Sequence, residues 1–127
     1  MKVYHFDGLD ECLTEDELGS LLEARFGARA NEFLLAGDSE YPYLAILVND
    51  GYSAMVYFPE DRESMFQAIG GNTALSVGET SVFYSGTPDQ EMEVWNEFVL
   101  PFALAKEAAL EFFATLSMPT CVEWSKQ

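Results

Sequence analysis

Apolar residues recur at helical spacing in two separate segments of the chain. In the first, an apolar stripe over residues 18–26 follows Thr14 and Glu17, whose spacing is that of a capping box. Gly27 is a natural end for such a helix. These signals together predict a helix over residues 14–26.

The second helical segment begins at Pro101, a residue type that favours the first turn of a helix. Its apolar stripe covers residues 102–116 and contains alanines, which would let the helix lie close to a sheet. Met118 and Pro119 end the pattern. A second helix is therefore predicted between the two prolines.

The middle of the chain is typical of β-structure. Residues 43–48 are apolar at every position, as expected of a central strand covered on both faces. Asp50 and Gly51 then give the signal of a type I′ turn, and residues 52–58 supply the returning strand. We therefore predict a hairpin at the centre of a sheet.

Further short strands are expected where apolar runs are bounded by turn-forming residues. Their ranges are 2–6, 32–36, 65–69, 80–84, 93–99 and 121–124. No linker or repeat divides the sequence, so residues 1–127 are expected to form a single domain. The order of elements predicts an α+β fold, with a mostly antiparallel sheet of about six to seven strands and two helices packed against it.

The charge balance changes what this domain is expected to contact. Twenty-two acidic residues against six basic ones give a net charge of -16, while 49% of the residues are hydrophobic. A disordered acidic chain lacks a core, so here the acids belong on the surface of a folded body. Such a surface repels nucleic acids and anionic membranes and favours a basic protein partner. We also expect a monomer, more than a dimer, when the protein is free.

Nothing in the sequence marks the chain for export or for a membrane. The N-terminal residues carry no secretory signal, and the longest apolar run, residues 43–48, is much shorter than a membrane span. Cys12 and Cys121 lack the spacing of a metal or redox motif, and two free thiols are favoured over a disulfide. A cytoplasmic protein is therefore expected.

Most catalytic equipment is missing from the sequence. His5 is the single histidine, for which a structural or surface role is favoured, and neither a nucleophile motif nor a phosphate loop is present. One histidine and two distant cysteines do not suit zinc, and residues 7–11 match a calcium loop only loosely. We expect no enzyme, no cofactor and no metal site. The many carboxylates leave one alternative open, a small carboxylate-dependent hydrolase or ligand-binding domain.

The segment over residues 89–97 combines acidic residues with a large aromatic side chain, a composition that suits a protein interface. The residues predicted to bind a partner are Asp89, Glu91, Glu93 and Trp95, with Glu60, Asp61 and Glu63 as a second patch beside the central hairpin. The alternative is that Trp95 faces the core while the glutamates alternate outward. The aromatic segments 41–43 and 57–59 raise the same question, and packing is favoured for them.

The C-terminal segment, residues 109–124, is similar to the ending of a known protein family. The residues that carry the similarity are Phe112, Phe113, Pro119, Val122 and Trp124. They resemble the Immunity protein 1 family, the small cytoplasmic antidotes of bacterial polymorphic toxin systems. The hairpin over residues 44–58 and the acidic stretch before Leu100 are similar in place. The resemblance covers about two thirds of the chain, and Leu116 and Ser117 replace a glycine often found before the proline.

This resemblance implies an α+β domain that neutralises a toxin domain by binding to it directly. Such toxins often attack nucleic acids as deaminases or nucleases, and their sites are basic, which agrees with the charge of this chain. We therefore predict an immunity protein that occludes the active site of a cognate toxin and has no catalytic activity. Two alternatives stay open: the hydrolase or ligand-binding domain, and an acidic nucleic-acid mimic that inhibits a DNA-binding protein.

Overall fold

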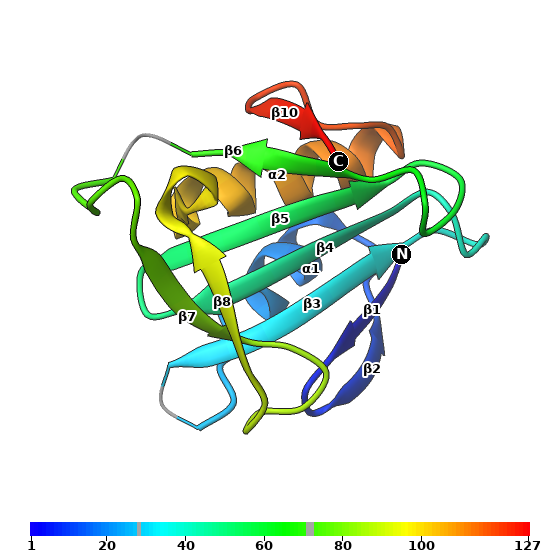
Figure 1. Cartoon of the computed structure of the whole chain (residues 1–127). Coiled ribbons are helices and arrows are strands. Elements are labelled where there is room, and N and C mark those ends of the chain that lie inside the picture. The colour runs from blue at the N-terminus through cyan, green and yellow to red at the C-terminus, as the bar shows by residue number, and fades with distance from the viewer. Residues whose placement is uncertain (28, 71–72) are drawn as a thin grey trace.

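The computed structural model describes residues 1–27, 29–70 and 73–127, which form a large sheet, two helices and a separate hairpin (Figure 1). The strands of the large sheet are β1 (Lys2–His5), β2 (Gly8–Glu11), β3 (Ala30–Ala36), β4 (Tyr43–Asn49), β5 (Tyr52–Phe58), β6 (Phe66–Ile69), β9 (Leu100–Pro101) and β10 (Glu123–Lys126). The other elements are α1 (Glu15–Leu21), α2 (Phe102–Thr115), the 3-10 helix η1 (Asn96–Phe98) and the hairpin strands β7 (Thr80–Tyr84) and β8 (Glu91–Trp95). The strand pairs are antiparallel, so the predicted α+β class is confirmed.

The strand order in the large sheet is β10-β6-β5-β4-β3-β1-β2, with β9 paired to β5. β4 and β5 pair along their whole lengths, from Tyr43 opposite Phe58 to Asn49 opposite Tyr52. The predicted central hairpin is therefore confirmed. Its turn is not of type I′, because the positive φ of 58° falls on Asp50 alone of the two turn residues.

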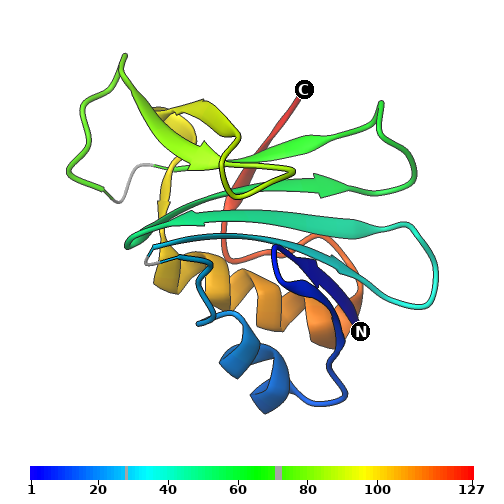
Figure 2. The same ribbon diagram turned by 90° about the horizontal axis from the view of Figure 1, so that it is seen from below.

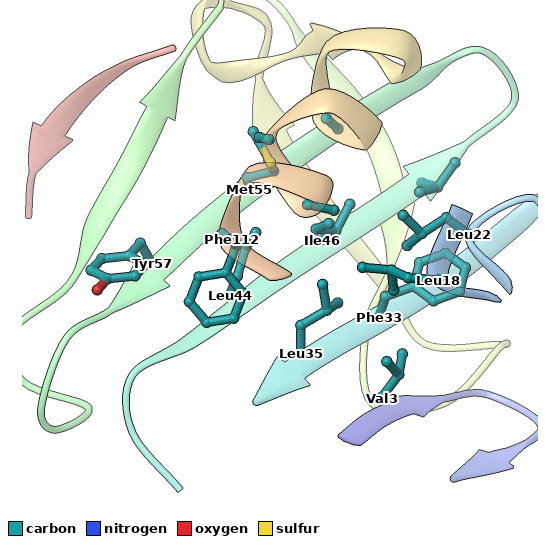
Figure 3. Packing of buried hydrophobic residues seen from close by; sticks show 14 of the residues in the cluster. Val3, Leu18, Leu22, Phe33, Leu35, Leu44, Ile46, Met55, Tyr57 and Phe112 are labelled. Atoms are coloured by element: carbon teal, nitrogen blue, oxygen red, sulfur yellow. The ribbon is translucent and has the colours of Figure 1, made fainter. Parts of the chain in front are cut away.

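The two helices cover one face of the large sheet, and the β7–β8 hairpin lies on the opposite face (Figure 2). On the helix side, alternate residues of the central strands point into one apolar core (Figure 3). Its largest fully buried side chains include Phe33, Phe112, Leu18, Leu22, Leu35, Leu44, Ile46 and Met55. Three buried alanines of α2, at positions 105, 108 and 109, let that helix lie close to the sheet, as the sequence predicts.

The hairpin side of the sheet has a smaller core. Leu47 of β4 and Ala54 of β5 are buried there against Phe83 and Val94 of the hairpin. Because the hairpin covers only one end of these strands, Tyr43 at the other end of β4 stays half-buried. The prediction that β4 is covered on both faces is therefore confirmed only for the part under the hairpin.

α1 is shorter than the sequence predicts. Its start is confirmed, because the Glu17 backbone N–H donates to Thr14 Oγ1 at 3.1 Å and so caps the helix. The helix ends at Leu21, and Arg25 Nη1 donates to the Leu22 carbonyl at 2.7 Å. A side chain thus satisfies a carbonyl that a longer helix would have paired internally. The predicted further turn of helix is therefore wrong.

The predicted strand over residues 93–99 is interrupted. β8 ends at Trp95, and a turn of 3-10 helix follows with the side chain of Asn96 buried. The Asn96 amide donates to the Ser76 carbonyl at 2.8 Å and accepts from Ser81 Oγ at 2.5 Å. A buried amide needs such partners, and the turn places it between them. This tertiary requirement overrides the local preference for a strand.

One strand was not predicted, and the starts of two other elements differ for reasons that the structure shows. β2 is an additional edge strand whose residues are all exposed, so no apolar alternation revealed it. β10 begins two residues later than predicted, because Trp124 Nε1 donates to the Pro119 carbonyl at 2.8 Å and holds the intervening residues in a turn. α2 begins at Phe102, and Pro101 occupies its N-cap position.

The two cysteines are free thiols, as the sequence predicts, with Cys12 buried and Cys121 half-buried. Burial raises the pKa of each thiol above its ordinary value. Within the part of the chain that the structure describes, no helix has the length and apolar character needed to cross a bilayer.

A carboxylate near the end of α2 fixes the turn that leads to β10. Glu111 Oε2 accepts hydrogen bonds from the Thr120 backbone N–H at 2.7 Å and from its hydroxyl at 2.8 Å. Burial acts to raise the pKa of Glu111, but these hydrogen bonds outweigh it and hold the pKa below its ordinary value of 4.5. The ionised carboxylate therefore stabilises the folded state.

Glu111→Gln should lower the free energy of unfolding by about 0.5–1 kcal/mol at pH 7, because a neutral amide accepts weaker hydrogen bonds at this partly exposed site. The stabilisation is present above the unfolded-state pKa and is lost as the pH falls through the lower folded-state pKa. Wild type and variant should therefore converge once the pH is below the folded-state pKa of Glu111. Urea unfolding at pH 7 and at low pH measures the difference. Glu107→Gln, on an exposed position of the same helix, is the control, and equal losses in both variants would contradict the assignment.

Candidate protein interface

β8 presents a row of acidic and aromatic side chains to solvent. Glu91, Glu93 and Trp95 alternate along the strand, so their side chains share its outer face. Trp95 is 53% exposed, whereas Val94 is 4% exposed and packs inward. The alternative in which Trp95 faces the core is therefore wrong, and the two glutamates and the tryptophan form one surface.

Four predicted residues lie together on the hairpin. We call Asp89, Glu91, Glu93 and Trp95 the hairpin patch. β7 supports it, because Thr80 pairs with Trp95 and donates its hydroxyl to Glu93 Oε1 at 3.0 Å. Asp89 lies in the turn between the strands, where Thr87 Oγ1 donates to its carboxylate at 2.8 Å. Asp89 thus shapes the turn and also supplies exposed charge.

Three hydrogen bonds fasten the hairpin to the sheet beneath it. Asn49 Nδ2 donates to the Val82 carbonyl at 2.8 Å. Ser85 Oγ and the Gly86 N–H donate to the two carboxylate oxygens of Glu32, at 2.6 and 3.2 Å. With the small core under the hairpin, these bonds hold the patch in place before any partner arrives. Such pre-organisation reduces the entropy lost on binding.

The second predicted patch lies on the loop between β5 and β6. We call its exposed residues Glu60, Asp61 and Glu63 the loop patch. Asp61 Oδ1 accepts hydrogen bonds from the backbone N–H groups of Glu63 at 2.9 Å and Ser64 at 2.7 Å. Asp61 therefore shapes the loop, while Glu60 and Glu63 supply charge at its surface.

The structure does not merge the two patches into one cluster. The hairpin is attached near the β4–β5 turn, through Asn49, whereas the loop patch follows the opposite end of β5. Both rise on the side of the sheet that faces away from the helices (Figure 2). A large partner on that side would meet both patches.

A hollow of about 440 Å³ lies beside the loop patch on the same side, and we call it the sheet hollow. Tyr4 of β1, Leu34 of β3 and Tyr43 of β4 line it, and Arg62 of the β5–β6 loop borders it. Tyr43 also stacks on Phe58 of β5, with ring centroids 4.4 Å apart and 18° between the ring planes. The hollow is thus floored by aromatic and apolar side chains from several strands.

The sequence did not single out the sheet hollow as a site. Tyr43 and Phe58 lie in the segments where packing was expected, and they do pack on each other. They do so on the open face of the sheet, whereas Tyr57 points into the helix-side core (Figure 3). Alternation along the strand separates Tyr57 from Phe58. Only the pairing of the strands, however, brings Tyr4 to the same place.

Charges of both signs surround the hollow. Lys2 and Arg62 are on its lining together with Asp38 and Glu40. Burial raises the pKa of Tyr43, while the positive charge of Arg62 acts against that rise. The Tyr43 phenol therefore stays protonated at neutral pH and is available both to donate and to accept a hydrogen bond.

Several polar groups outside the two patches make hydrogen bonds within the domain. His5 Nε2 hydrogen-bonds Asp10 Oδ2 at 2.7 Å, and its Nδ1 accepts from the Asp7 N–H at 3.3 Å, contacts that hold the β1–β2 turn. A hydrogen bond from the Lys106 ammonium, at 2.7 Å, lowers the pKa of Glu23. Among the described residues, no three His, Cys, Asp or Glu side chains are grouped to hold a metal ion.

Comparison with known proteins defines the class of this domain. Residues 11–126 match the family described as Immunity protein Imm1. The chain is also 32% identical, over 122 residues and 95% of each chain, to the double-stranded DNA deaminase immunity protein of Burkholderia cenocepacia (strain H111). The domain is thus an immunity protein, the antidote class of toxin systems. In particular, the chain belongs to the Imm1 family, and the resemblance at its C-terminal end is confirmed.

Proposed function

We propose that this chain neutralises a cognate toxin that acts on nucleic acid, in the first place a DNA deaminase, by covering its basic active site. The observation that carries the proposal is the exposed row of acids and Trp95 on a chain with a net charge of -16. The relative's name, which specifies a double-stranded DNA deaminase, supports the choice of toxin class.

The charge of the chain fits such a target. An enzyme that acts on nucleic acid gathers Lys and Arg around its active site to hold phosphates, and a strongly acidic surface is complementary to them. Electrostatic steering would raise the association rate constant toward about 10⁸–10⁹ M⁻¹s⁻¹ at low salt. Buried aromatic contacts, with Trp95 as the first candidate, would then slow dissociation.

We propose that the protein acts in the cytoplasm, that it is a monomer when free, and that it inhibits the toxin by binding alone. Inhibition by occlusion needs neither a cofactor nor a catalytic group on the inhibitor. It also needs no contact between the inhibitor and nucleic acid, which the same negative charge would oppose.

A pull-down from the native cell tests the proposal. The tagged chain is used as bait at low and at moderate salt, and recovered proteins are identified by mass spectrometry. We expect a basic toxin domain that remains bound at moderate salt. Its deaminase activity on double-stranded DNA should disappear when the chain is added in equimolar amount. Recovery of salt-labile basic proteins only, with no toxin domain among them, would overturn the proposal.

Reversal of two hairpin-patch charges, Glu91→Lys with Glu93→Lys, should slow association with the toxin by about tenfold or more at low salt. The slope of association rate against salt should also become flatter, because fewer charges steer the encounter. Stopped-flow or biosensor kinetics over a salt series measures both quantities.

The matched control reverses two exposed acids on the helix side, Glu15→Lys with Glu107→Lys, and changes the net charge by the same amount. Its association rate should fall much less, since distant charges are screened. Equal effects from the two double variants would remove the hairpin patch from the interface.

A further inference from the structure

Building on the function proposed above, we infer that the toxin docks on the open face of the sheet. We further infer that it inserts an apolar or aromatic side chain, flanked by Lys or Arg, into the sheet hollow. The hairpin patch and the loop patch then form the acidic rim on either side of this insertion.

The hollow and the hairpin share one face of the sheet. Tyr43 and Leu47 are four residues apart on β4, so their side chains point the same way, and the same holds for Phe58 and Ala54 on β5. Leu47 and Ala54 are buried under the hairpin, whereas Tyr43 and Phe58 are only half-buried. Four residues of strand span about 13 Å. The hairpin is therefore a wall beside an open aromatic floor.

The charges on the lining of the hollow cancel. Lys2 and Arg62 balance Asp38 and Glu40, on a protein whose net charge is -16. The centres of protein interfaces are depleted in charged residues and enriched in Tyr and Arg, and their rims are polar. The hollow shares with such centres its two tyrosines and its arginine, the charges on its lining cancel, and acidic patches lie around it.

The floor of the hollow is accessible to a partner. Tyr4 is 48% exposed although it lies on a strand of the large sheet. Exposed aromatic groups in a concave site bury large areas when a complementary side chain enters. The acidic rim selects the chemistry of that partner, because Glu60 and Glu63 on one side and the hairpin patch on the other attract flanking cations.

The helix side offers a contrasting surface. A hollow of about 390 Å³ lies there between α1 and α2. Its lining carries Glu15, Asp16 and Glu23, with Lys106 and Leu110, and within the described chain it includes no aromatic side chain. A toxin would find negative charge in that hollow without the aromatic contacts that keep a complex from dissociating.

Paired substitutions test the inference with the toxin domain recovered in the pull-down as the probe. Tyr4→Ser with Arg62→Ser removes an aromatic group and a cation from the sheet hollow. Its dissociation constant should rise by about tenfold or more, mainly through faster dissociation. The control, Leu13→Ser with Lys106→Ser, removes an exposed apolar group and a cation at the helix side and should stay within about threefold of wild type.

The outcomes separate this inference from the proposed function. If the sheet-hollow variant binds within threefold of wild type while the toxin is still inhibited, the docking site is overturned and the proposed function stands. If wild type neither binds nor inhibits the toxin, both fail together. Circular dichroism verifies that the variants fold. Should the double variant unfold, Tyr4→Ser alone, at a position that is 48% exposed, replaces it and should weaken binding in the same direction.

Discussion

Gly70→Ala should lower the free energy of unfolding by about 3 kcal/mol. A Cβ at this position would lie 2.1 Å from the carbonyl oxygen of Val99 and 2.8 Å from its carbonyl carbon. The Gly70 N–H also donates to the Glu97 carbonyl at 2.7 Å, which keeps the two segments together. Backbone atoms in a packed core yield little, so β6 and the segment around η1 must separate. Since η1 directly follows β8, the hairpin patch should shift as well.

Gly51→Ala is the matched control for this substitution. A Cβ there would meet nothing within 4 Å, and the φ of Gly51 is outside the left-handed region. Its effect should stay within about 0.5 kcal/mol, and reduced freedom of the unfolded chain favours a small gain. Urea unfolding of both variants measures the contrast. A Gly70→Ala protein as stable as wild type would show that the Val99 backbone does not lie against Gly70.

Phe112→Ala should lower the free energy of unfolding by about 3–5 kcal/mol. The ring is fully buried on the helix side and packs edge-on against Tyr57, with centroids 6.2 Å apart (Figure 3). Its removal takes away apolar burial and leaves a cavity between α2 and the sheet that the surrounding side chains fill only in part. A loss of this size is a large part of the stability of a typical small domain.

The control is Phe26→Ala, which removes the same side chain from a position that is 44% exposed. That variant should lose about 1 kcal/mol. Thermal unfolding followed by calorimetry compares the two. At temperatures where Phe112→Ala remains folded, its affinity for the toxin should be unchanged, because Phe112 lies on the opposite side of the sheet from the proposed interface. Similar stability losses in both variants would contradict the assignment of Phe112 to the core.

Strands bounded by strong turn signals were predictable from local sequence. β5 and β7 have the predicted bounds, because turn-forming residues border them. Asp50 and Gly51 precede β5, and Ser85 and Gly86 follow β7. The start of α1 was predictable for the same reason, since Thr14 caps it through a contact only three residues long. In each case neighbouring residues determine the local structure.

The boundaries that were wrong depend on hydrogen bonds made by polar side chains, which apolar spacing does not reveal. Asn96 interrupts the predicted strand because its partner Ser76 lies 20 residues away. α1 stops early because Arg25 satisfies a carbonyl of the following segment, and local apolar spacing carries no sign of that contact. Such breaks follow from the satisfaction of polar groups in the folded chain and not from propensity.

One part of the candidate interface was likewise predictable from local sequence, and another part was not. The outward row of Glu91, Glu93 and Trp95 follows from the period of two along a strand, once the register is known. The sheet hollow does not follow from any local pattern. It exists because β3 pairs with β1 and not with β2, the strand that precedes β3 in the chain. It also exists because the hairpin covers only part of the face.

Occlusion of the toxin's active site is tested most directly by competition with DNA. A catalytically inactive form of the toxin domain is bound to a fluorescently labelled DNA duplex, and the chain is added while anisotropy is followed at constant salt. We expect the chain to release the duplex completely when it is equimolar with the toxin domain, and we expect excess DNA to raise the amount of chain that release requires. A ternary complex that retains the duplex at saturating chain would contradict it.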